Sequence, residues 1–415
     1  MTATRRVAIV AGCRTPFCKA GTALAGATAV DLAQHATREL LARTELDPRE
    51  VQLVVMGQVL PSVLAPNLAR EVSLLPQFPR EVPAFTVGAA CASANQAITD
   101  AADRILLGHA EVAIAGGAET LSNIPILHSR PMSDTLVALS RARTLGDRLR
   151  LLAQVRPRHF VPVVPAIAEP STGLTMGQSA EKMAKENGIS REDQDGWALR
   201  SHQLAHAGHQ DGRLAAEIAP FPTRAGAAAE DNGVRADTSL DRMQALRPVF
   251  DREHGSVTAG NASPLTDGAS AVLLMSEEKA RALGYAPLAF VRAHALAAVD
   301  PGAQLLMGPV YAVPRALERA GLAWTDIGLI EMHEAFASQV LSNIQGFEGH
   351  GWRVDRDIIN VMGGSIAIGH PFGATGGRLV TTLAHEMRRR QAQFGLVSVC
   401  AQGGLGSATV LELAP

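Results

Sequence analysis

The stretch CASANQAITDAADRILLGHAEVAIAGG, residues 91–117, carries the pattern that decides the fold. Its first part predicts a helix over about residues 91–107, since apolar side chains recur at three- and four-residue spacing: Ile98, Ala101, Ala102, Ile105 and Leu106. Gly108 ends this pattern, and the apolar run VAIA from Val112 is typical of a buried strand. A helix followed by a buried strand indicates an α/β protein.

The same order returns near the other end of the chain. Residues 377–404, GRLVTTLAHEMRRRQAQFGLVSVCAQGG, predict a helix, a strand from Phe394 and a glycine pair. Further strands are predicted by VAIVA from Val7 and PLAFVRA from Pro287. Alternating strands and helices favour βαβ units with mostly parallel sheets. The chain contains either a duplicated α/β half or two βα units that are alike by chance.

Residues 122–264 lie between these regions and have weaker periodicity with more proline, histidine and charge. We expect an inserted loop domain there. Residues 1–121 plus 265–286 then form an N-terminal half, and residues 287–415 form a C-terminal half.

One segment of the predicted loop domain concentrates positive charge. Residues 139–160 contain six arginines and one aspartate beside apolar side chains at helical spacing: Leu145, Leu149, Leu152 and Val155. This basic amphipathic segment is either a solvated helix packed on its own protein or a docking surface for a membrane or a partner.

The overall composition narrows the class of protein. A chain of 415 residues with 47% hydrophobic and 19% charged residues can bury large cores in two or more domains. Its formal net charge of -2 offers no general attraction to nucleic acid. Arg14 interrupts the N-terminal apolar run too early for a signal peptide. Because the four cysteines are too scattered for a disulfide framework, we expect a cytoplasmic protein with free thiols: Cys13, Cys18, Cys91 and Cys400.

Cys91 stands among small residues at the start of the predicted helix. Unpaired N–H groups and the helix dipole stabilise a thiolate there, which predicts a lowered pKa and a nucleophilic sulfur. Small neighbours such as Gly88 and Ser93 would admit a substrate. On these local residues alone, an inert buried thiol is the better interpretation, because free cysteine is among the most buried residue types.

A second candidate lies in GGSIAIGHPFGATGG, residues 363–377, where His370 occupies a turn that leads into a helix. Six of these residues are glycine, which suits close approach of the backbone to a ligand or another strand. A histidine there can take a thiol proton as a general base, or it can pair with backbone as a structural turn residue.

Cys400 begins CAQGGLG, a glycine-rich turn after a strand. It is either a structural cysteine or a second thiol that exchanges protons with a substrate, while nearby N–H groups hold an oxyanion. HEAFA from His333 lacks the second histidine of HExxH, and neither a GxxxxGK nor a GxGxxG loop occurs. The sequence therefore predicts no metal site and no bound cofactor.

Five motifs, taken in order, resemble the thiolase family: GAACASA from Gly88, TAGNAS from Thr258, HEAFA from His333, GHPFGATGGR from Gly369 and CAQGGLG from Cys400. The likeness begins at Val7 and extends through GSATVLEL from Gly406, which is essentially the whole chain. It implies the thiolase fold, with two βαβαβαββ halves in five αβαβα layers and a loop domain inserted in the first half. It also implies a homodimer or homotetramer.

The resemblance assigns roles to individual residues. Cys91 is then the nucleophile that takes the acyl group as a thioester, His370 the base that activates it, and Cys400 the second acid/base. The N–H groups of Cys91 and Gln402 are expected to form one oxyanion hole, and His370 with His333 the other. Coenzyme A is expected to contact five residues: Met176, Ala259, Gly260, Ser263 and Met307.

Position 333 departs from the commonest family pattern, which is NEAF. His333 resembles the β-subunit of the trifunctional fatty-acid oxidation complex and its bacterial relatives, as do TLSNIPILHSR from Thr120 and LLMGPVYA from Leu305. In such relatives the insertion that corresponds to residues 133–165 contacts a membrane or the hydratase/dehydrogenase α-subunit. Either is therefore an expected partner of residues 139–160.

The resemblance implies a 3-ketoacyl-CoA thiolase of fatty-acid β-oxidation, an acyltransferase with acyl-CoA and coenzyme A as substrates. A short-chain acetyl-CoA acetyltransferase is the nearest alternative, although Thr175 replaces a histidine found in many short-chain synthetic members. A decarboxylating or aldol-type condensing enzyme is disfavoured by Cys400. A non-catalytic acyl-CoA or lipid-binding protein is disfavoured by the presence of both thiols.

Overall fold

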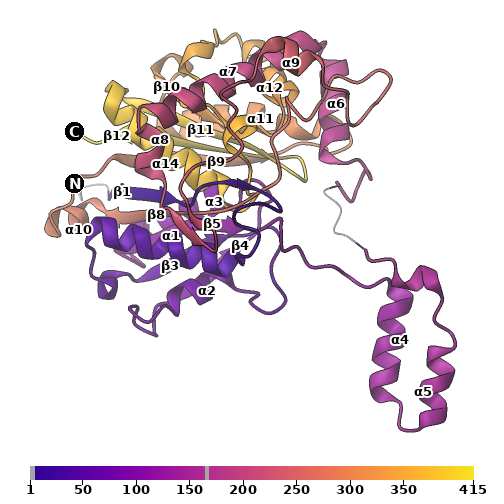
Figure 1. Ribbon diagram of the computed structural model, residues 1–415. Coiled ribbons are helices and arrows are strands. Elements are labelled where there is room, and N and C mark those ends of the chain that lie inside the picture. Colours follow the sequence, from indigo (N-terminus) through magenta and orange to yellow (C-terminus); the bar gives the residue numbers. More distant parts are fainter. Residues whose placement is uncertain (1–4, 164–167) are drawn as a thin grey trace. The chain divides into compact units, whose positions relative to one another are not determined.

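The described part of the chain, residues 5–163 and 168–415 of a computed structural model, forms two compact units (Figure 1). One unit lies within Met1–Asn123 and Glu169–Pro415, and the other within Ile124–Ala168. Residues 169–264 therefore belong to the same unit as the sheet. The expected boundaries of the loop domain and of the two halves stay a prediction. Residues 1–4 and 164–167, which fall inside those boundaries, lie outside the described residues.

A ten-stranded mixed sheet runs through the first unit, and nine of its strands form two groups of similar design. The first group, in spatial order, is β1 (Val7–Arg14), β8 (Thr266–Ser276), β5 (Val112–Glu119), β3 (Leu53–Gly57) and β4 (Ala84–Val87). The second is β9 (Ala289–Ala298), β12 (Leu405–Leu413), β11 (Phe394–Ala401) and β10 (Leu329–Met332). The short strand β2 (Cys18–Lys19) pairs with β8, and the groups join through β1 and β9.

Most neighbouring strands are antiparallel, so the prediction of mostly parallel sheets is wrong. Among the described residues, only β3 with β4, β3 with β5, and β10 with β11 pair in parallel. The cause is that each group contains one strand that runs antiparallel to both of its neighbours. This strand is β8 in the first group and β12 in the second. β12 follows β11 directly, because Gly403 and Gly404 adopt φ angles of 85° and 73° that suit a tight hairpin turn.

Helices cover the strand groups and create three apolar cores (Figure 1). The central core contains α3 (Ser93–Leu106) and α14 (Thr375–Arg390). One outer core contains α1 (Ala29–Thr44) and α2 (Leu68–Ser73), and the other contains α11 (Gly308–Ala320) and α12 (Ala337–Gly349). In β5, Ala113 and Ala115 face the central core whereas Val112 and Ile114 face an outer core. The predicted fold of two similar halves in five αβαβα layers is confirmed.

Residues 169–264 pack against this framework through a buried ion pair. The guanidinium of Arg14, on β1, donates to both carboxylate oxygens of Asp231 at 2.7 and 2.8 Å, and both side chains are fully buried. The elements of this region are α6 (Met176–Glu186), α7 (Arg191–Gln210), α8 (Arg213–Glu217), β6 (Phe221–Thr223), β7 (Gly226–Ala228) and α9 (Leu240–Gln244). Two further short helices occur elsewhere, α10 (Glu277–Ala282) and α13 (Ser365–Ile368).

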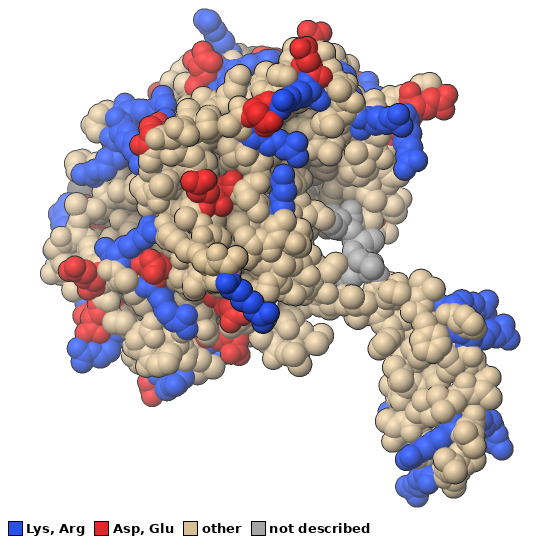
Figure 2. All heavy atoms as spheres, viewed as in Figure 1, with Lys and Arg blue, Asp and Glu red and all other residues tan. Residues whose placement is uncertain are grey.

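The second unit contains α4 (Arg130–Arg141) and α5 (Leu145–Leu152). Thr144 caps α5 by accepting a hydrogen bond from the backbone N–H of Asp147 at 3.1 Å. Leu145, Leu149 and Phe160 are exposed, and Figure 2 shows basic side chains gathered on the surface of this unit. Across the described residues, no helix is both long enough and apolar enough to cross a membrane.

Candidate active site

Cys91 lies in a tight turn between β4 and α3. Helix α3 begins two residues later at Ser93, whose Oγ accepts a hydrogen bond from Ala89 N (2.9 Å) and donates one to Ala90 O (2.7 Å). Ala90 has a φ of 48°, a left-handed conformation that costs a residue other than glycine about 1–3 kcal/mol. The rest of the structure holds this strained turn in place, and the turn fixes the position of the thiol.

Two glycines allow α3 to approach its neighbours closely. A Cβ on Gly376 of α14 would lie 2.0 Å from Asn95 Oδ1 of α3. A Cβ on Gly57 of β3 would lie 2.4 Å from the backbone of Ser93. Any larger residue would therefore push α3 away. This close packing brings the loop before α14, which carries His370, next to Cys91.

Cys91 and His370 form a hydrogen-bonded pair. His370 Nε2 lies 3.1 Å from Cys91 Sγ. The other ring nitrogen, Nδ1, lies 2.7 Å from Oγ1 of Thr375, the first residue of α14. A nucleophile and a base within hydrogen-bond distance can transfer a proton directly as the nucleophile attacks.

Both members of this pair are neutral near pH 7. Burial raises the pKa of the Cys91 thiol to about 12, although the backbone N–H groups of Gln402 and of Cys91 itself oppose the rise. Burial lowers the pKa of His370 to about 3, and the charge of Arg378 lowers it further. The prediction of a thiolate at the helix start is therefore wrong. Cys91 precedes the N-cap residue Ala92, and loss of water outweighs the helix dipole.

His333 lies beside His370, in the loop between β10 and α12, with the two ring centroids 4.0 Å apart. Its Nδ1 lies 2.9 Å from Ser365 Oγ, while its buried Nε2 has no hydrogen-bond partner among the described residues. Burial lowers the pKa of His333 well below its usual value, and the neighbouring His370 and Arg378 lower it further. A neutral imidazole in this position can donate a hydrogen bond to a substrate oxygen.

The ligand atoms of Cys91, His333 and His370 all lie within 4.8 Å of one another. A thiol and two imidazoles are of the type that binds zinc, and no other such group occurs in the part of the chain that the structure describes. The sequence predicts that no metal is bound, and this stays a prediction.

Cys400 lies near the end of β11, buried in an apolar cluster that also contains Met176, Met307 and Phe336. The two methionines that the resemblance assigns to coenzyme A thus lie around the second thiol. Burial raises the pKa of Cys400 well above its usual value, and the nearby Cys91 raises it further. The structure therefore brings both predicted thiols into one site.

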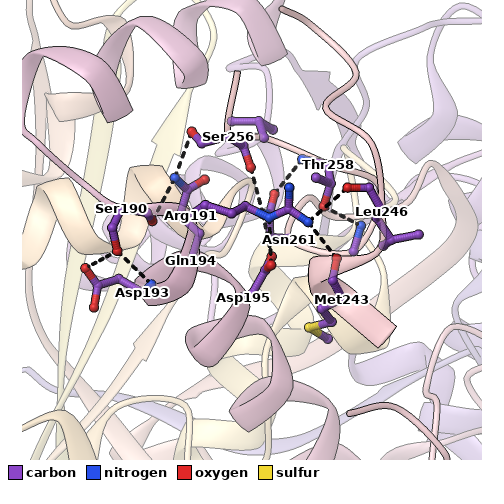
Figure 3. Close-up of polar contacts among 12 residues, drawn as sticks. Ser190, Arg191, Asp193, Gln194, Asp195, Met243, Leu246, Ser256, Thr258 and Asn261 are labelled. Carbon is purple, nitrogen blue, oxygen red and sulfur yellow. Dashed lines mark hydrogen bonds and ion pairs between the residues drawn. The ribbon is translucent and has the colours of Figure 1, made fainter. Parts of the chain in front are cut away.

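The TAGNAS segment, residues 258–263, is anchored at its centre by Asn261 (Figure 3). The Asn261 side chain accepts a hydrogen bond from Thr258 N at 2.8 Å and donates one to Asp195 Oδ1 at 2.9 Å. Asp195 is held in turn by Arg191, whose Nε lies 2.6 Å from Asp195 Oδ2. The segment is therefore fixed by α7.

The same segment pairs with the HEAFA loop. Ser263 N donates to Ala335 O at 3.0 Å, and Ala337 N donates to the backbone oxygen of Asn261 at 2.9 Å. Two of the positions assigned to coenzyme A, Gly260 and Ser263, are half-buried, and the third, Ala259, is exposed. The TAGNAS segment thus connects the loop of His333 with the protein surface.

Three polar residues with contacts in the site were not identified from the sequence: Ser365, Thr375 and Glu119. The Glu119 carboxylate accepts hydrogen bonds from the backbone N–H groups of Val59, Leu60 and Gly373 at 2.9, 3.1 and 3.1 Å. Burial raises the pKa of Glu119 to about 7. Ser365 and Thr375 stand five residues before and after His370, so both lie within the motif of residues 363–377 and could have been named as candidates. Their spacing, however, does not show which histidine nitrogen each hydroxyl contacts.

Comparisons with known proteins agree with this geometry. The family models for the thiolase N-terminal and C-terminal domains match residues 7–278 and 285–413. A 3-ketoacyl-CoA thiolase of Pectobacterium atrosepticum is 48% identical, and the match covers 99% of this chain and 97% of that protein. The corresponding protein of Yersinia enterocolitica is 47% identical over 98% of this chain and 97% of its own length.

Solved structures show the same fold. The acetyl-CoA acetyltransferase of Bacillus anthracis matches with a TM-score of 0.88 at 33% identity, covering 100% of both chains. Human mitochondrial 3-ketoacyl-CoA thiolase matches with a TM-score of 0.87 at 34% identity, covering 99% of this chain and 100% of that chain. Because the family models and these relatives match nearly the whole chain, the protein belongs to the thiolase family and is an acyltransferase.

Proposed function

We propose that this protein is a 3-ketoacyl-CoA thiolase that cleaves 3-ketoacyl-CoA with coenzyme A to acetyl-CoA and a shortened acyl-CoA. The observation that carries the proposal is the 3.1 Å contact between Cys91 Sγ and His370 Nε2, with a second buried thiol, Cys400, in the same site. One thiol can hold the acyl group while the other moves a proton. Acyl transfer coupled to carbon–carbon cleavage needs both tasks.

In the first half-reaction, Cys91 Sγ attacks the 3-carbonyl carbon while its proton passes to His370 Nε2. The bond between C2 and C3 then breaks, leaving an acyl thioester on Cys91 and the carbanion of acetyl-CoA. The Cys400 thiol protonates that carbanion and becomes a thiolate.

In the second half-reaction, the thiol of coenzyme A attacks the acyl thioester and gives its proton to the Cys400 thiolate. The departing sulfur of Cys91 takes back the proton held by His370, which restores the starting state. No step requires a cofactor, since coenzyme A is the second substrate.

Two sets of donors can hold the oxygen that becomes negative in these steps. The N–H groups of Cys91 and Gln402, both directed at the Cys91 sulfur, form one set. His333 Nε2 and His370 form the other. For coenzyme A, we propose contacts with Met176 and Met307 near the thiols. We propose further contacts with Ala259, Gly260 and Ser263 of the TAGNAS segment.

Mass spectrometry after mixing with acetoacetyl-CoA tests this proposal. The wild-type protein is expected to gain an acetyl group on Cys91, and Cys91→Ala is expected to lose both this label and turnover. Cys18→Ala, which removes a buried thiol outside the site, should retain both. Turnover by Cys91→Ala would refute the mechanism.

A short-chain acetyl-CoA acetyltransferase is the second candidate, favoured by the likeness to the Bacillus anthracis enzyme of that name. The two functions share their chemistry and differ in the acyl chain they accept. Cleavage of 3-ketohexadecanoyl-CoA would support the first function, and cleavage of acetoacetyl-CoA alone would support the second. Absence of both activities with unmodified Cys91 would favour a non-catalytic binding protein.

The second unit, Ile124–Ala168, supports a proposal about partners. Its exposed leucines and arginines suit a membrane surface or a hydratase/dehydrogenase α-subunit, and we propose one of these as the partner of residues 139–160. Co-purification with the cognate subunit and flotation with anionic vesicles distinguish the two. A cytoplasmic location and assembly as a homodimer or homotetramer are further proposals.

A further inference from the structure

Two histidines side by side in the site pose a question about proton positions. Both rings are buried and neutral, and their centroids are 4.0 Å apart. A neutral imidazole carries one proton, so each ring has one nitrogen that donates and one that accepts. The hydrogen-bond partner of Nδ1 decides what Nε2 can do, and it is Nε2 of His370 that meets Cys91.

The partner of His333 is Ser365, whose hydroxyl has two neighbours. Arg378 Nη2 lies 3.3 Å from Ser365 Oγ, and a guanidinium can only donate. Ser365 Oγ therefore accepts from Arg378. Among the described residues His333 Nδ1, 2.9 Å away, is the one acceptor recorded for the Ser365 hydroxyl, so we infer that its single hydrogen is directed there. His333 Nδ1 is then the acceptor, and the proton of this ring lies on Nε2.

Arg378 is itself fixed in this orientation. Its Nη1 donates to Glu331 Oε2 at 2.7 Å, and both side chains are buried. Because the guanidinium is a rigid planar group, the contact of Nη1 with Glu331 also fixes the direction of Nη2 toward Ser365. The direction of the Ser365 hydroxyl is therefore determined by groups outside the site.

The partner of His370 is Thr375, and here the direction is reversed. Thr375 Oγ1 donates its hydrogen to the carbonyl oxygen of Pro371 at 3.1 Å, an oxygen that can only accept. Thr375 Oγ1 then accepts from His370 Nδ1–H at 2.7 Å. The lone pair of His370 Nε2 is left facing Cys91 Sγ.

We propose that Ser365 and Thr375 are positioning residues that hold His333 and His370 in opposite tautomers. His333 presents an Nε2–H donor to the substrate oxygen, and His370 presents an Nε2 lone pair to the Cys91 thiol. The buried His333 Nε2, which has no partner among the described residues, is the donor that this arrangement leaves available. The assignment of these tasks rests on the proposed thiolase reaction, whereas the tautomers themselves do not.

Nuclear magnetic resonance of protein labelled with ¹⁵N-histidine tests the tautomers directly, because protonated and unprotonated ring nitrogens have well-separated shifts. His333→Gln and His370→Gln assign the two signals. The expected spectrum has His333 protonated at Nε2 and His370 at Nδ1. Two rings with the same tautomer would overturn the proposal, and this result is readable without substrate, even if the protein has no thiolase activity.

Variants test what the hydroxyls do. Ser365→Ala is expected to populate the other tautomer of His333 and to lower kcat by about 10- to 100-fold, less than the roughly 10²–10³-fold expected for loss of a whole oxyanion donor. KM should change little, and Ser365→Thr, which keeps the hydroxyl, should restore much of kcat. Thr375→Val should alter the His370 signal and leave that of His333 unchanged.

Ser73→Ala is the matched control, because Ser73 is a buried serine that also accepts from an arginine, Arg70, but lies in α2 outside the site. Its histidine spectrum and kcat should equal those of the wild type. An unchanged His333 tautomer in Ser365→Ala would refute the role of Ser365. If that variant does not fold, the wild-type spectrum still decides between opposite and identical tautomers.

Discussion

The two halves of the sheet carry different chemistry at equivalent positions. Cys91 precedes α3, which leads to β5, and His370 precedes α14, which leads to β11. Strand β3 lies beside β5 as β10 lies beside β11. Gln58 follows β3, and His333 occupies the equivalent position after β10. The shared framework brings two helix-start loops together. In the proposed mechanism, one loop supplies the nucleophile and the other supplies the base.

The two halves also supply different numbers of residues to the proposed site. In the proposed mechanism, the first half contributes one reacting atom, Cys91 Sγ, together with Glu119, which holds the backbone of Gly373. The second half contributes His333, His370 and Cys400. We therefore expect substitutions in the second half to separate the steps of the reaction, whereas loss of Cys91 removes all of them.

Loss of the base is expected to have the largest effect. His370→Ala should lower kcat/KM by about 10²–10⁴-fold, because the Cys91 thiol, with a pKa raised to about 12 by burial, then loses its proton acceptor. The rate at which iodoacetamide alkylates Cys91 should fall in parallel. His254→Ala, which removes an exposed histidine, is the control. Unchanged alkylation would show that His370 does not activate the thiol.

Removal of the second thiol should separate the two half-reactions. Cys400→Ala is expected to lower the rate of carbon–carbon cleavage by about 10²-fold, since no acid remains to protonate the carbanion. Transfer of an acetyl group from acetyl-CoA to Cys91 should slow much less, because the departing coenzyme A sulfur can leave as a thiolate without a proton from Cys400, whereas a carbanion cannot. Single-turnover labelling measures that transfer. Equal loss of labelling and cleavage would contradict separate roles for the thiols.

The pH dependence tests whether the pair from the two halves is neutral. The pKa of His370 is lowered to about 3, so it stays unprotonated as pH falls, and the pKa of Cys91 is raised to about 12, so it stays protonated as pH rises. The rate of Cys91 acylation should therefore be level from about pH 5 to 9, without the loss below about pH 6.5 that an ordinary histidine base would cause.

Two buried carboxyl groups can titrate within that range, Glu119 and Glu331, and burial raises the pKa of Glu331 to about 8. Glu119 has a pKa raised to about 7 by burial, and it holds Gly373 in the loop of His370. If the rate of Cys91 acylation changes near pH 7 and this change disappears in Glu119→Gln, the change belongs to the Glu119 carboxyl group. A decrease in rate that survives in Glu119→Gln and also in Glu331→Gln would instead mean that Cys91 or His370 titrates there.

The sequence predicted individual helices and strands well, because their signals are local. Periodic apolar residues identified the helix after Cys91 and the strand from Val112, and the structure contains both, as α3 and β5. The strand directions were wrong, because the glycine pair Gly403 and Gly404 forms a hairpin turn that looks the same in sequence as a turn into a helix.

The site was predicted less completely, for a physical reason. Motifs identified residues that the structure brings together, Cys91, His333 and His370. The pKa of Cys91, however, depends on burial by the whole fold, and a local argument from the helix dipole gave the wrong sign. Ser365 and Thr375 were visible in the motif, yet their importance depends on contacts with His333 and His370 that only the packed structure defines.

The smallest expected effect concerns the contact that joins the halves. Gly376→Ala would direct a Cβ to within 2.0 Å of Asn95 Oδ1, so it should lower the free energy of unfolding by about 1–3 kcal/mol. Gly196→Ala is the matched control in α7, where a Cβ meets nothing within 4 Å, and it should raise that free energy by about 0.5–1 kcal/mol.

Urea unfolding measures both variants, and the rate of Cys91 alkylation shows what the loss of packing does to the site. If α3 and α14 must pack closely to hold Cys91 against His370, Gly376→Ala should slow alkylation as well as destabilise the fold. A destabilised protein with normal alkylation would mean that the strained turn at Ala90 and the contacts of His370 with Thr375 and Leu265 position the pair without help from the helices.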